Sequence, residues 1–165
     1  MPTYDFIVIG SGIAGLSYTV KVADYFQQRQ IPIKIALITK TVAEETNTKY
    51  AQGGIATVWD TADSFEKHID DTMVAGDFVS DRKVVEIVVK EAPERLKELI
   101  AYGTDFDRQA DGSFDLVKEG GHSDKRILHY KDSTGNEIER ALLAKAKSFP
   151  SVDFFTHYFA VEDRK

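Results

Sequence analysis

Residues 5–16 read Asp-Phe-Ile-Val-Ile-Gly-Ser-Gly-Ile-Ala-Gly-Leu, a short apolar segment followed directly by a Gly-x-Gly-x-x-Gly turn. This pattern is typical of the start of a dinucleotide-binding domain. We expect Gly10 to make the tight turn, Gly12 to let the backbone approach a pyrophosphate, and Gly15 to let the next helix pack on the strand. The phosphates would lie at the N-terminus of that helix, where backbone N–H groups and the helix dipole favour anions.

The segments around this turn predict a strand, a helix and a second strand. Residues 5–9 are a β-branched and aromatic run bounded by glycine, which indicates a buried parallel strand. Apolar residues recur at spacings of three and four from Ile13 to about Gln28, which predicts a helix that ends before Pro32. Residues 33–38 read as the second strand, so we expect a right-handed crossover within a parallel sheet.

Further elements follow along the chain. Asp63 and Glu66 resemble a capping box for a helix over about 64–75. A second helical region runs from Asp81 to Tyr102, and we expect Pro93 to divide it into two shorter helices.

The last third of the chain completes an α/β pattern. Residues 104–118 are turn-rich and predict a small hairpin outside the core, residues 134–148 predict a helix, and residues 152–161 predict one strand or two strand pieces. The expected fold is therefore a Rossmann-like α/β core with a parallel sheet, helices on both faces and a small hairpin insertion.

Composition excludes several classes of protein. The chain has 165 residues, 42% of them hydrophobic and 29% charged, which is typical of one globular domain. Its formal net charge is −6 and its basic residues are scattered, so we expect no nucleic-acid partner. The absence of cysteine excludes thiolate metal sites and dithiol redox chemistry in this chain, and no other metal-ligand cluster is visible. No apolar run is long enough to span a membrane and no signal segment is visible, so we expect a cytoplasmic location.

The end of the second strand departs from the usual NAD site. An acidic residue normally accepts hydrogen bonds from the ribose there, whereas this chain has Thr39 and Lys40. Glu44 or Glu45 would have to swing back to replace it. A basic residue in this place would alternatively suit the 2′-phosphate of NADP, or Lys40 would simply face solvent.

A second polar, small-residue loop follows at residues 46–56. It offers backbone N–H groups, the Thr48 hydroxyl and the Gln52 amide to a large planar polar ligand, which a plain NAD domain does not need. The alternative reading is an ordinary surface loop.

Four stretches together resemble the L-aspartate oxidases, flavoproteins of bacterial NAD biosynthesis. They are Ile-Gly-Ser-Gly-Ile-Ala-Gly-Leu at 9–16, Leu-Ile-Thr-Lys at 37–40, Thr-Lys-Tyr-Ala-Gln-Gly-Gly-Ile-Ala at 48–56, and Glu-Gly-Gly-His-Ser-Asp-Lys-Arg-Ile-Leu-His at 119–129. The first and third are shared with the wider succinate dehydrogenase and fumarate reductase flavoprotein group, and the fourth is more specific. The resemblance runs the whole length of the chain.

The resemblance implies FAD as the cofactor, with Ser11–Ala14 at the pyrophosphate, Lys40 beside the adenosine ribose and residues 47–54 around the ribityl chain and flavin ring. Covalent members of the wider group have a histidine where this chain has Asn47, so the implied FAD is bound non-covalently. The implied cofactor-binding residues are Gly10, Ser11, Gly12, Ile13, Ala14, Gly15, Lys40, Asn47, Thr48, Lys49, Tyr50, Ala51, Gln52, Gly53, Gly54, Phe159 and Ala160.

Glu119 is the candidate for recognising the α-ammonium group that distinguishes aspartate from succinate. A carboxylate there would attract aspartate, whereas succinate would leave that carboxylate desolvated and unpaired next to a dianion. The alternative is an exposed acid in a turn. His122 would donate to a substrate carboxylate, although a lone histidine is more often structural. Arg126 has the fork that pairs with carboxylates, and a solvated basic turn is equally compatible with the sequence.

The implied activity is FAD-dependent oxidation of L-aspartate to iminoaspartate, with oxygen or fumarate as the electron acceptor and a partner enzyme that consumes iminoaspartate. Enzymes of this group carry a later substrate-capping domain and a catalytic arginine. We therefore expect residues 1–165 to be the N-terminal part of the FAD-binding domain of an incomplete two-domain flavoprotein, with no catalytic residue in it and little activity alone. The alternatives are a fumarate reductase or succinate dehydrogenase type of flavoprotein, or a non-catalytic nucleotide-binding module.

Overall fold

The computed structural model describes residues 2–161, and the chain divides into two compact units. Unit 1 is formed by Met1–Ala51, Tyr102–Thr104 and Gly135–Lys165. Unit 2 is formed by Gln52–Ala101 and Asp105–Thr134.

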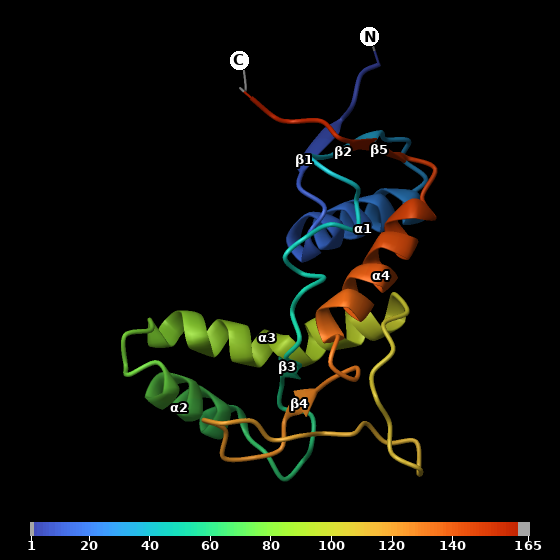
Figure 1. The fold of residues 1–165 in the computed structure, drawn as a ribbon. Coiled ribbons are helices and arrows are strands. Elements are labelled where there is room, and N and C mark those ends of the chain that lie inside the picture. The colour runs from blue at the N-terminus through green and yellow to red at the C-terminus, as the bar shows by residue number, and fades with distance from the viewer. Residues whose placement is uncertain (1, 162–165) are drawn as a thin grey trace. The chain divides into compact units, whose positions relative to one another are not determined.

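Unit 1 is built on a three-stranded parallel sheet. Its strands are β1 (Phe6–Ile9), β2 (Ile35–Thr39) and β5 (Val152–Thr156), in the order β1-β2-β5 (Figure 1). Phe6 lies opposite Ile35 in the register of β1 and β2, and Ile35 lies opposite Val152 in that of β2 and β5. The parallel sheet predicted from the first glycine-rich turn is confirmed, and β5 ends at Thr156, five residues before the predicted end.

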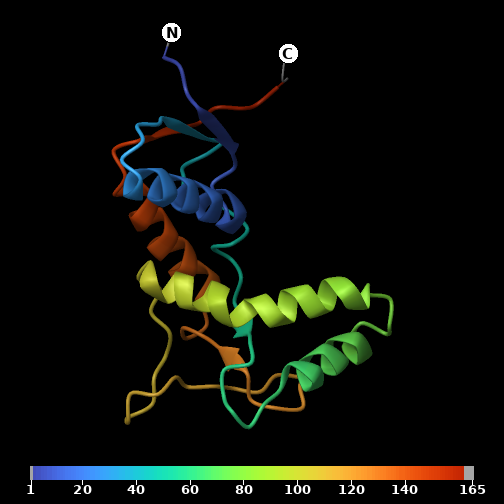
Figure 2. The same ribbon diagram turned by 180° about the vertical axis from the view of Figure 1, so that it is seen from behind.

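Two helices, α1 (Ile13–Gln28) and α4 (Thr134–Lys147), lie on the same side of this sheet (Figures 1 and 2). Both crossovers move across the sheet in the same direction, from β1 to β2 and then to β5, so right-handed connections place both helices on one face. On β1, Ile7 and Ile9 are 64% and 70% exposed. Within residues 2–161, helices therefore cover only one face of the sheet. The helices that we expected on its other face are not found in this range.

The apolar faces predicted for α1 and α4 form the core of unit 1. Leu16, Val20 and Ala23 are buried on α1, whereas Ile13, which we expected on the same face, is 39% exposed. On α4 the predicted inner residues are all buried, namely Ile138, Leu142, Leu143 and Ala146. Periodicity thus predicted both helices and most of their buried large apolar residues, but not the buried polar residues Thr19, Glu137 and Glu139.

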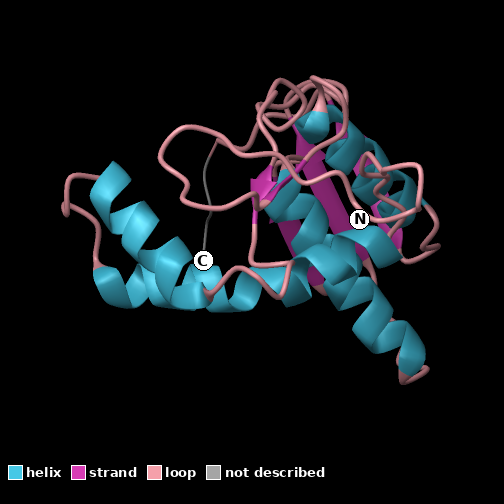
Figure 3. Ribbon diagram, turned by 90° about the horizontal axis from the view of Figure 1, so that it is seen from below, coloured by secondary structure: helices cyan, strands magenta, loops and turns pink. Residues whose placement is uncertain are grey.

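Unit 2 contains a pair of helices and a two-stranded sheet. The helices α2 (Phe65–Ala75) and α3 (Arg82–Ala101) lie side by side (Figures 1 and 2). The strands β3 (Ile55–Ala56) and β4 (Ile127–Leu128) pair antiparallel. Figure 3 shows in pink the loops that connect the helices and strands.

The expected division of the second helical region at Pro93 is wrong, because α3 is one helix with Pro93 inside it. Proline within a helix costs about 3 kcal/mol. Here both halves of the helix are held by burial: Val85 and Val89 belong to one hydrophobic cluster, and Leu96 belongs to another. Packing on both sides of Pro93 therefore outweighs the local preference for a break.

Two local predictions also need correction. The N-terminal cap of α2 is Ser64, whose Oγ accepts a hydrogen bond from the backbone N–H of Lys67 at 3.2 Å, and not Asp63. The predicted hairpin over residues 104–118 is present around a bridge between Arg108 and Phe114. However, Phe106 is only 2% exposed, so this segment also contributes to the core.

Gly15 provides a test of how tightly α1 packs on the turn before it. A Cβ atom at this position would lie 2.0 Å from the carbonyl oxygen of Gly10. We expect Gly15→Ala to lower the free energy of unfolding by about 3 kcal/mol or more, because the backbone must shift to relieve the overlap. Chemical denaturation of the full-length parent protein measures this, with the exposed neighbour Ala14→Ser as the control. Equal stability of the two variants would contradict the packing argument.

Candidate functional site

A cavity of about 570 Å³ in unit 1 lies where the parallel strands end. It is lined by residues that follow the carboxyl ends of all three strands, including Gly10 after β1, Lys40 after β2 and Phe159 after β5. In α/β sheets this edge is the usual place for a ligand. The loop over Thr46–Thr48 completes the lining.

The glycine-rich turn leaves the cavity open beside the start of α1. Gly10 has a φ of +102°, a conformation that side-chain-bearing residues rarely adopt. A Cβ at Gly12 would meet only the Thr48 hydroxyl, at an ordinary 3.5 Å, so nothing in the protein itself requires glycine there. The unfilled space at Gly12 fits the close approach of a pyrophosphate that the motif predicts.

The structure brings part of the predicted cofactor set together in this cavity. The predicted residues that line it are Gly10, Ser11, Gly12, Lys40, Asn47, Thr48, Tyr50, Phe159 and Ala160. Those of unit 1 that are not in its lining are Ile13, Ala14, Gly15, Lys49 and Ala51. Gln52, Gly53 and Gly54 begin unit 2.

Two hydrogen bonds fix the walls of the cavity. The backbone N–H of Ile13, in the first turn of α1, donates to the Thr48 hydroxyl at 3.0 Å. The Ser11 hydroxyl, buried at 2% exposure, donates to Thr39 Oγ1 at 3.1 Å. The Ser11 side chain is therefore engaged within the protein, which leaves its backbone for a ligand.

The two acidic residues that we considered as partners of the ribose, Glu44 and Glu45, have different surroundings in the structure. Glu44 pairs with Lys147 at 3.0 Å, and the hydrogen bond from Lys147 lowers the pKa of the Glu44 carboxyl. Glu45 lines the cavity together with Lys40 and accepts a hydrogen bond from the Tyr50 hydroxyl at 2.5 Å. The acidic Glu45 and the basic Lys40 therefore both border the cavity.

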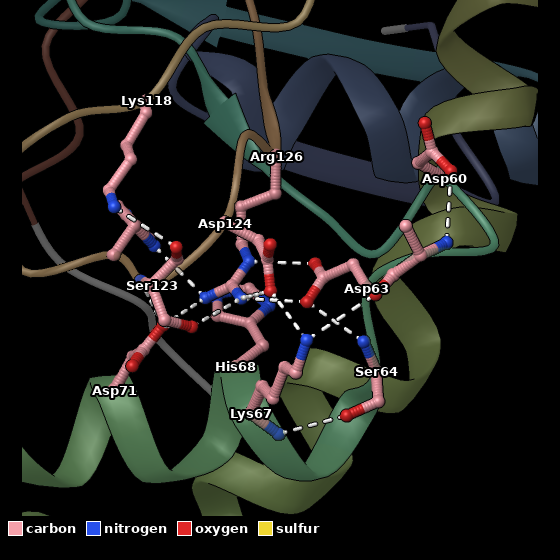
Figure 4. A network of polar contacts seen from close by, with 12 residues as sticks. Asp60, Asp63, Ser64, Lys67, His68, Asp71, Lys118, Ser123, Asp124 and Arg126 are labelled. Carbon is pink, nitrogen blue, oxygen red and sulfur yellow. Dashed lines mark hydrogen bonds and ion pairs between the residues drawn. The ribbon is translucent and has the colours of Figure 1, made fainter.

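In unit 2, Arg126 lies at the centre of a buried polar network (Figure 4). Its side chain is 0% exposed and forms a two-point contact with Asp63, at 2.8 Å from Nε and 2.7 Å from Nη2. Its Nη1 donates to Asp71 at 2.5 Å. The Ser123 backbone N–H and hydroxyl also donate to Asp71, at 2.7 and 2.8 Å. Arg126 is thus neither a solvated basic turn nor free to bind a substrate carboxylate, which corrects both readings of the sequence.

Burial and hydrogen bonding shift the pKa values of the two aspartates in this network in opposite directions. Burial alone would raise the pKa of the Asp63 carboxyl, but hydrogen bonds from Arg126 and from the Ser64 N–H outweigh it and lower that pKa. The pKa of Asp71 is likewise lowered, because hydrogen bonds from Ser123 and Arg126 outweigh burial. Burial lowers the pKa of His68, and the neighbouring charge of Arg126 lowers it further. The network therefore keeps the Asp63 and Asp71 carboxylates ionised beside the Arg126 guanidinium, with the Asp124 carboxylate 4.0 Å from Arg126 and paired with Lys67 at 2.9 Å.

The same network holds the segment that carries Glu119 and His122. The Glu119 carbonyl accepts from the His122 backbone N–H at 3.3 Å, and the Glu119 side chain is exposed. Arg126 Nη1 lies 3.3 Å from His122 Nδ1. Because a guanidinium only donates, His122 Nδ1 is the acceptor in this contact, which leaves Nε2 for a donor role. His122 therefore has its donor directed away from Arg126.

Sequence reasoning missed several residues of both sites. Asp63 and Asp71 were not connected with Arg126, since their separations of 63 and 55 residues form no local pattern. The cavity lining also includes residues outside the implied cofactor-binding set, namely Ile9, Ile38, Thr39, Thr41, Glu45, Thr46 and Tyr158. For Thr39 and Thr41 the available signal was their place just after the end of a predicted strand, whereas Tyr158 follows the observed end of β5 at Thr156.

Comparison with known proteins assigns the family. Residues 5–162 match the family described as the FAD binding domain. The chain belongs to this FAD-binding domain family. The L-aspartate oxidase 2-a of Nicotiana tabacum, named as chloroplastic, is 48% identical over 159 residues, which are 96% of this chain and 24% of that protein. The L-aspartate oxidase of Acinetobacter baylyi is 35% identical over 96% of this chain and 28% of its own length. The suspected resemblance to L-aspartate oxidases is confirmed.

Solved structures agree with the fold. A mutant of the E. coli quinol fumarate reductase has a TM-score of 0.82 and 32% sequence identity, covering 93% of this chain and 26% of that one. The chain spans about a quarter of the length of the curated relatives it matches. FAD is the cofactor of the family, and the open space at Gly12 and the lining by Lys40 and Glu45 suit its pyrophosphate and ribose.

Residues 2–161 contain neither a membrane-spanning helix nor a cluster of metal ligands. No helix in that range is long and apolar enough to cross a membrane. No group of three or more histidine, aspartate or glutamate side chains in the same range is placed to hold a metal ion.

The Arg126 network makes a strong prediction about stability. Arg126→Leu leaves the Asp63 carboxylate buried without its partner, which we expect to cost about 3 to 5 kcal/mol. Arg82→Leu is the matched control, because Arg82 pairs with Asp70 at 3.0 Å on the surface and such pairs contribute about 1 kcal/mol or less. Denaturant unfolding of the parent protein compares them, and equal losses would show that the buried pair is not special.

The lowered pKa values of Asp63 and Asp71 give a direction for acid unfolding. A carboxyl whose pKa is lower in the folded state stabilises the fold above its unfolded pKa, and this contribution is lost as the pH falls below about 4. We expect Asp63→Asn to be less stable than the wild type at pH 7, with a gap that narrows below about pH 4. Melting curves from pH 7 to pH 3 measure the gap, and a constant gap would refute the assignment.

Proposed function

We propose that this chain is the FAD-binding part of an L-aspartate oxidase, which converts L-aspartate to iminoaspartate in NAD biosynthesis. The observation that carries the proposal is the 48% identity with a tobacco L-aspartate oxidase over 96% of this chain. In the reaction, L-aspartate loses a hydride from Cα and a proton from its nitrogen. FAD, when bound, supplies the two-electron acceptor.

Glu119 and His122 have distinct roles in this proposal. The exposed Glu119 carboxylate pairs with the α-ammonium group of aspartate. The Nε2–H of His122 donates to a carboxylate of the substrate, since Nδ1 is taken by Arg126. Arg126 holds this segment to Asp63 and Asp71 and does not touch the substrate.

The remaining parts of the proposal concern electrons and partners. Oxygen or fumarate reoxidises the flavin, and an enzyme that consumes iminoaspartate acts next. A cytoplasmic location stays a prediction, and the tobacco relative is named as chloroplastic.

A second candidate is a fumarate reductase or succinate dehydrogenase type of flavoprotein. The TM-score of 0.82 with a fumarate reductase favours it. Asn47 opposes its covalent members because an amide cannot take the place of the attachment histidine, and Glu119 opposes succinate as the preferred substrate, because a carboxylate would repel a dianion without an ammonium group.

Glu119→Gln separates the two candidates in the full-length parent enzyme. The loss of charge should lower kcat/KM for L-aspartate by about 10- to 100-fold, because hydrogen bonds between charged groups contribute about 1.5 to 3 kcal/mol. Succinate oxidation should change far less. Asp111→Asn, in the exposed hairpin turn, is the control. Equal effects on both substrates would remove the proposed role of Glu119.

The parent holoenzyme tests the activity itself. We expect flavin absorbance in the purified protein and hydrogen peroxide when L-aspartate and oxygen are supplied. Release of the flavin on acid precipitation would agree with non-covalent binding. A protein without flavin that gains none from added FAD would instead be a non-catalytic module, and succinate oxidation as efficient as that of L-aspartate would favour the second candidate.

A further inference from the structure

Helix α4 contacts the loop that borders the cavity of unit 1. The Gly135 backbone N–H, in the first turn of α4, donates to the Ala51 carbonyl at 2.9 Å. A Cβ at Gly135 would lie 2.0 Å from the Thr48 carbonyl oxygen and 2.8 Å from the Ala51 side chain. The helix and the loop therefore meet backbone to backbone, with no room for a side chain between them.

Glu139, one turn further along α4, is an unusual residue for this place. It is 3% exposed, although glutamate is almost never fully buried unless paired. The Thr46 hydroxyl donates to its Oε2, and the backbone N–H of Lys49 donates to the Thr46 hydroxyl at 3.4 Å. Both donors come from the loop over Thr46–Lys49.

The energetic balance at Glu139 is unfavourable for a purely structural side chain. Burial raises the pKa of the Glu139 carboxyl above its ordinary value. Its Oε1 has no hydrogen-bond partner within residues 2–161. Lys49, whose positive charge acts on the Glu139 carboxyl, pairs with Glu45 at 3.6 Å. An apolar residue of the same size would avoid these costs but would leave the Thr46 hydroxyl without its acceptor.

The loop that Glu139 holds is the one that lines the cavity. Thr46, Asn47 and Thr48 are all in its wall. The Thr48 hydroxyl in turn accepts the hydrogen bond from the Ile13 N–H, at the start of α1. A chain of contacts therefore runs from Glu139 through Thr46–Thr48 to the turn where the pyrophosphate is expected.

We propose that Glu139 is a positioning residue for FAD: through Thr46 it fixes the Thr46–Thr48 loop in the conformation that lines the cofactor cavity. This inference rests on the assignment of that cavity to FAD. Glu139 itself does not touch the cofactor, because it acts from behind the loop.

FAD binding to the apo form of the full-length parent tests the proposal. Titration with FAD, followed by flavin fluorescence, should give a Kd about 10-fold higher for Glu139→Leu than for the wild type, which corresponds to the loss of about 1.4 kcal/mol from one hydrogen bond. Glu139→Gln keeps an acceptor for Thr46 and should stay within about threefold of the wild type. Asn136→Ala, exposed on the same helix, is the control and should leave the Kd unchanged.

A double-mutant cycle decides whether Glu139 acts through Thr46. Thr46→Val and Glu139→Leu should each raise the Kd for FAD. The Kd of the double variant should be no higher than that of the single variant with the higher Kd. Additive losses would overturn the proposal, as would a Glu139→Leu protein with a lower melting temperature and an unchanged Kd for FAD. If Glu139→Leu does not fold, Thr46→Val and Thr46→Ser test the same hydrogen bond from its other end: a raised Kd for FAD in Thr46→Val with a near wild-type Kd in Thr46→Ser would support the proposal, and equal Kd values in the two variants would oppose it. A wild-type parent that binds no FAD would contradict the cofactor assignment itself, which is a separate result.

Discussion

The parallel alignment of β1, β2 and β5 is the constraint on which the arrangement of unit 1 depends. Since the three strands run in one direction, their carboxyl ends meet at one edge, and the segments that follow them are brought together whatever their distance in the sequence. Gly10, Lys40 and Phe159 border one cavity for this reason alone. The same alignment requires crossover connections, which place α1 and α4 on one face of the sheet.

Unit 2 depends on a different kind of order. It has only two strands of two residues each, and its loops are long. A buried guanidinium with two carboxylates supplies the organisation that regular backbone pairing supplies in unit 1. Arg126 connects the segment before α2, α2 itself and the segment after Glu119, so the position of the proposed substrate-recognition residues depends on charges that are distant in the sequence.

The parts of the fold that were predictable are those governed by short-range patterns. The helix over Ile13–Gln28 was predicted with its observed bounds, because its apolar spacing, the preceding glycines and Pro32 all agree. The helix α4 and its buried face followed from the same periodicity. By contrast, β3 and β4 exist only through their pairing with each other, across about 70 residues of chain, and two-residue strands have no readable period.

The candidate sites divide in the same way. Local motifs predicted the glycine-rich turn and the loop after β2. In such ligand-binding turns, the residues that allow the required backbone conformation lie within the turn itself and can be read from the sequence. The polar networks were not predictable: the partner of Asp63 and the burial of Glu139 are set by tertiary contacts, and each residue alone reads as an ordinary surface acid. The role proposed for Glu119 came from the resemblance to the family, and neither its exposure nor its neighbours would have suggested it.

The proline within α3 has a consequence for local motion. Pro93 offers no N–H to the preceding turn, so the helix is weakest in its middle rather than at its ends. The half with Val85 and Val89 and the half with Leu96 are anchored in separate clusters, each of which can stay intact while the turn between them opens. Amide hydrogens of residues 90–92, next to Pro93, should therefore exchange with solvent faster than those in either half, so that one continuous helix behaves in solution as two cooperative units.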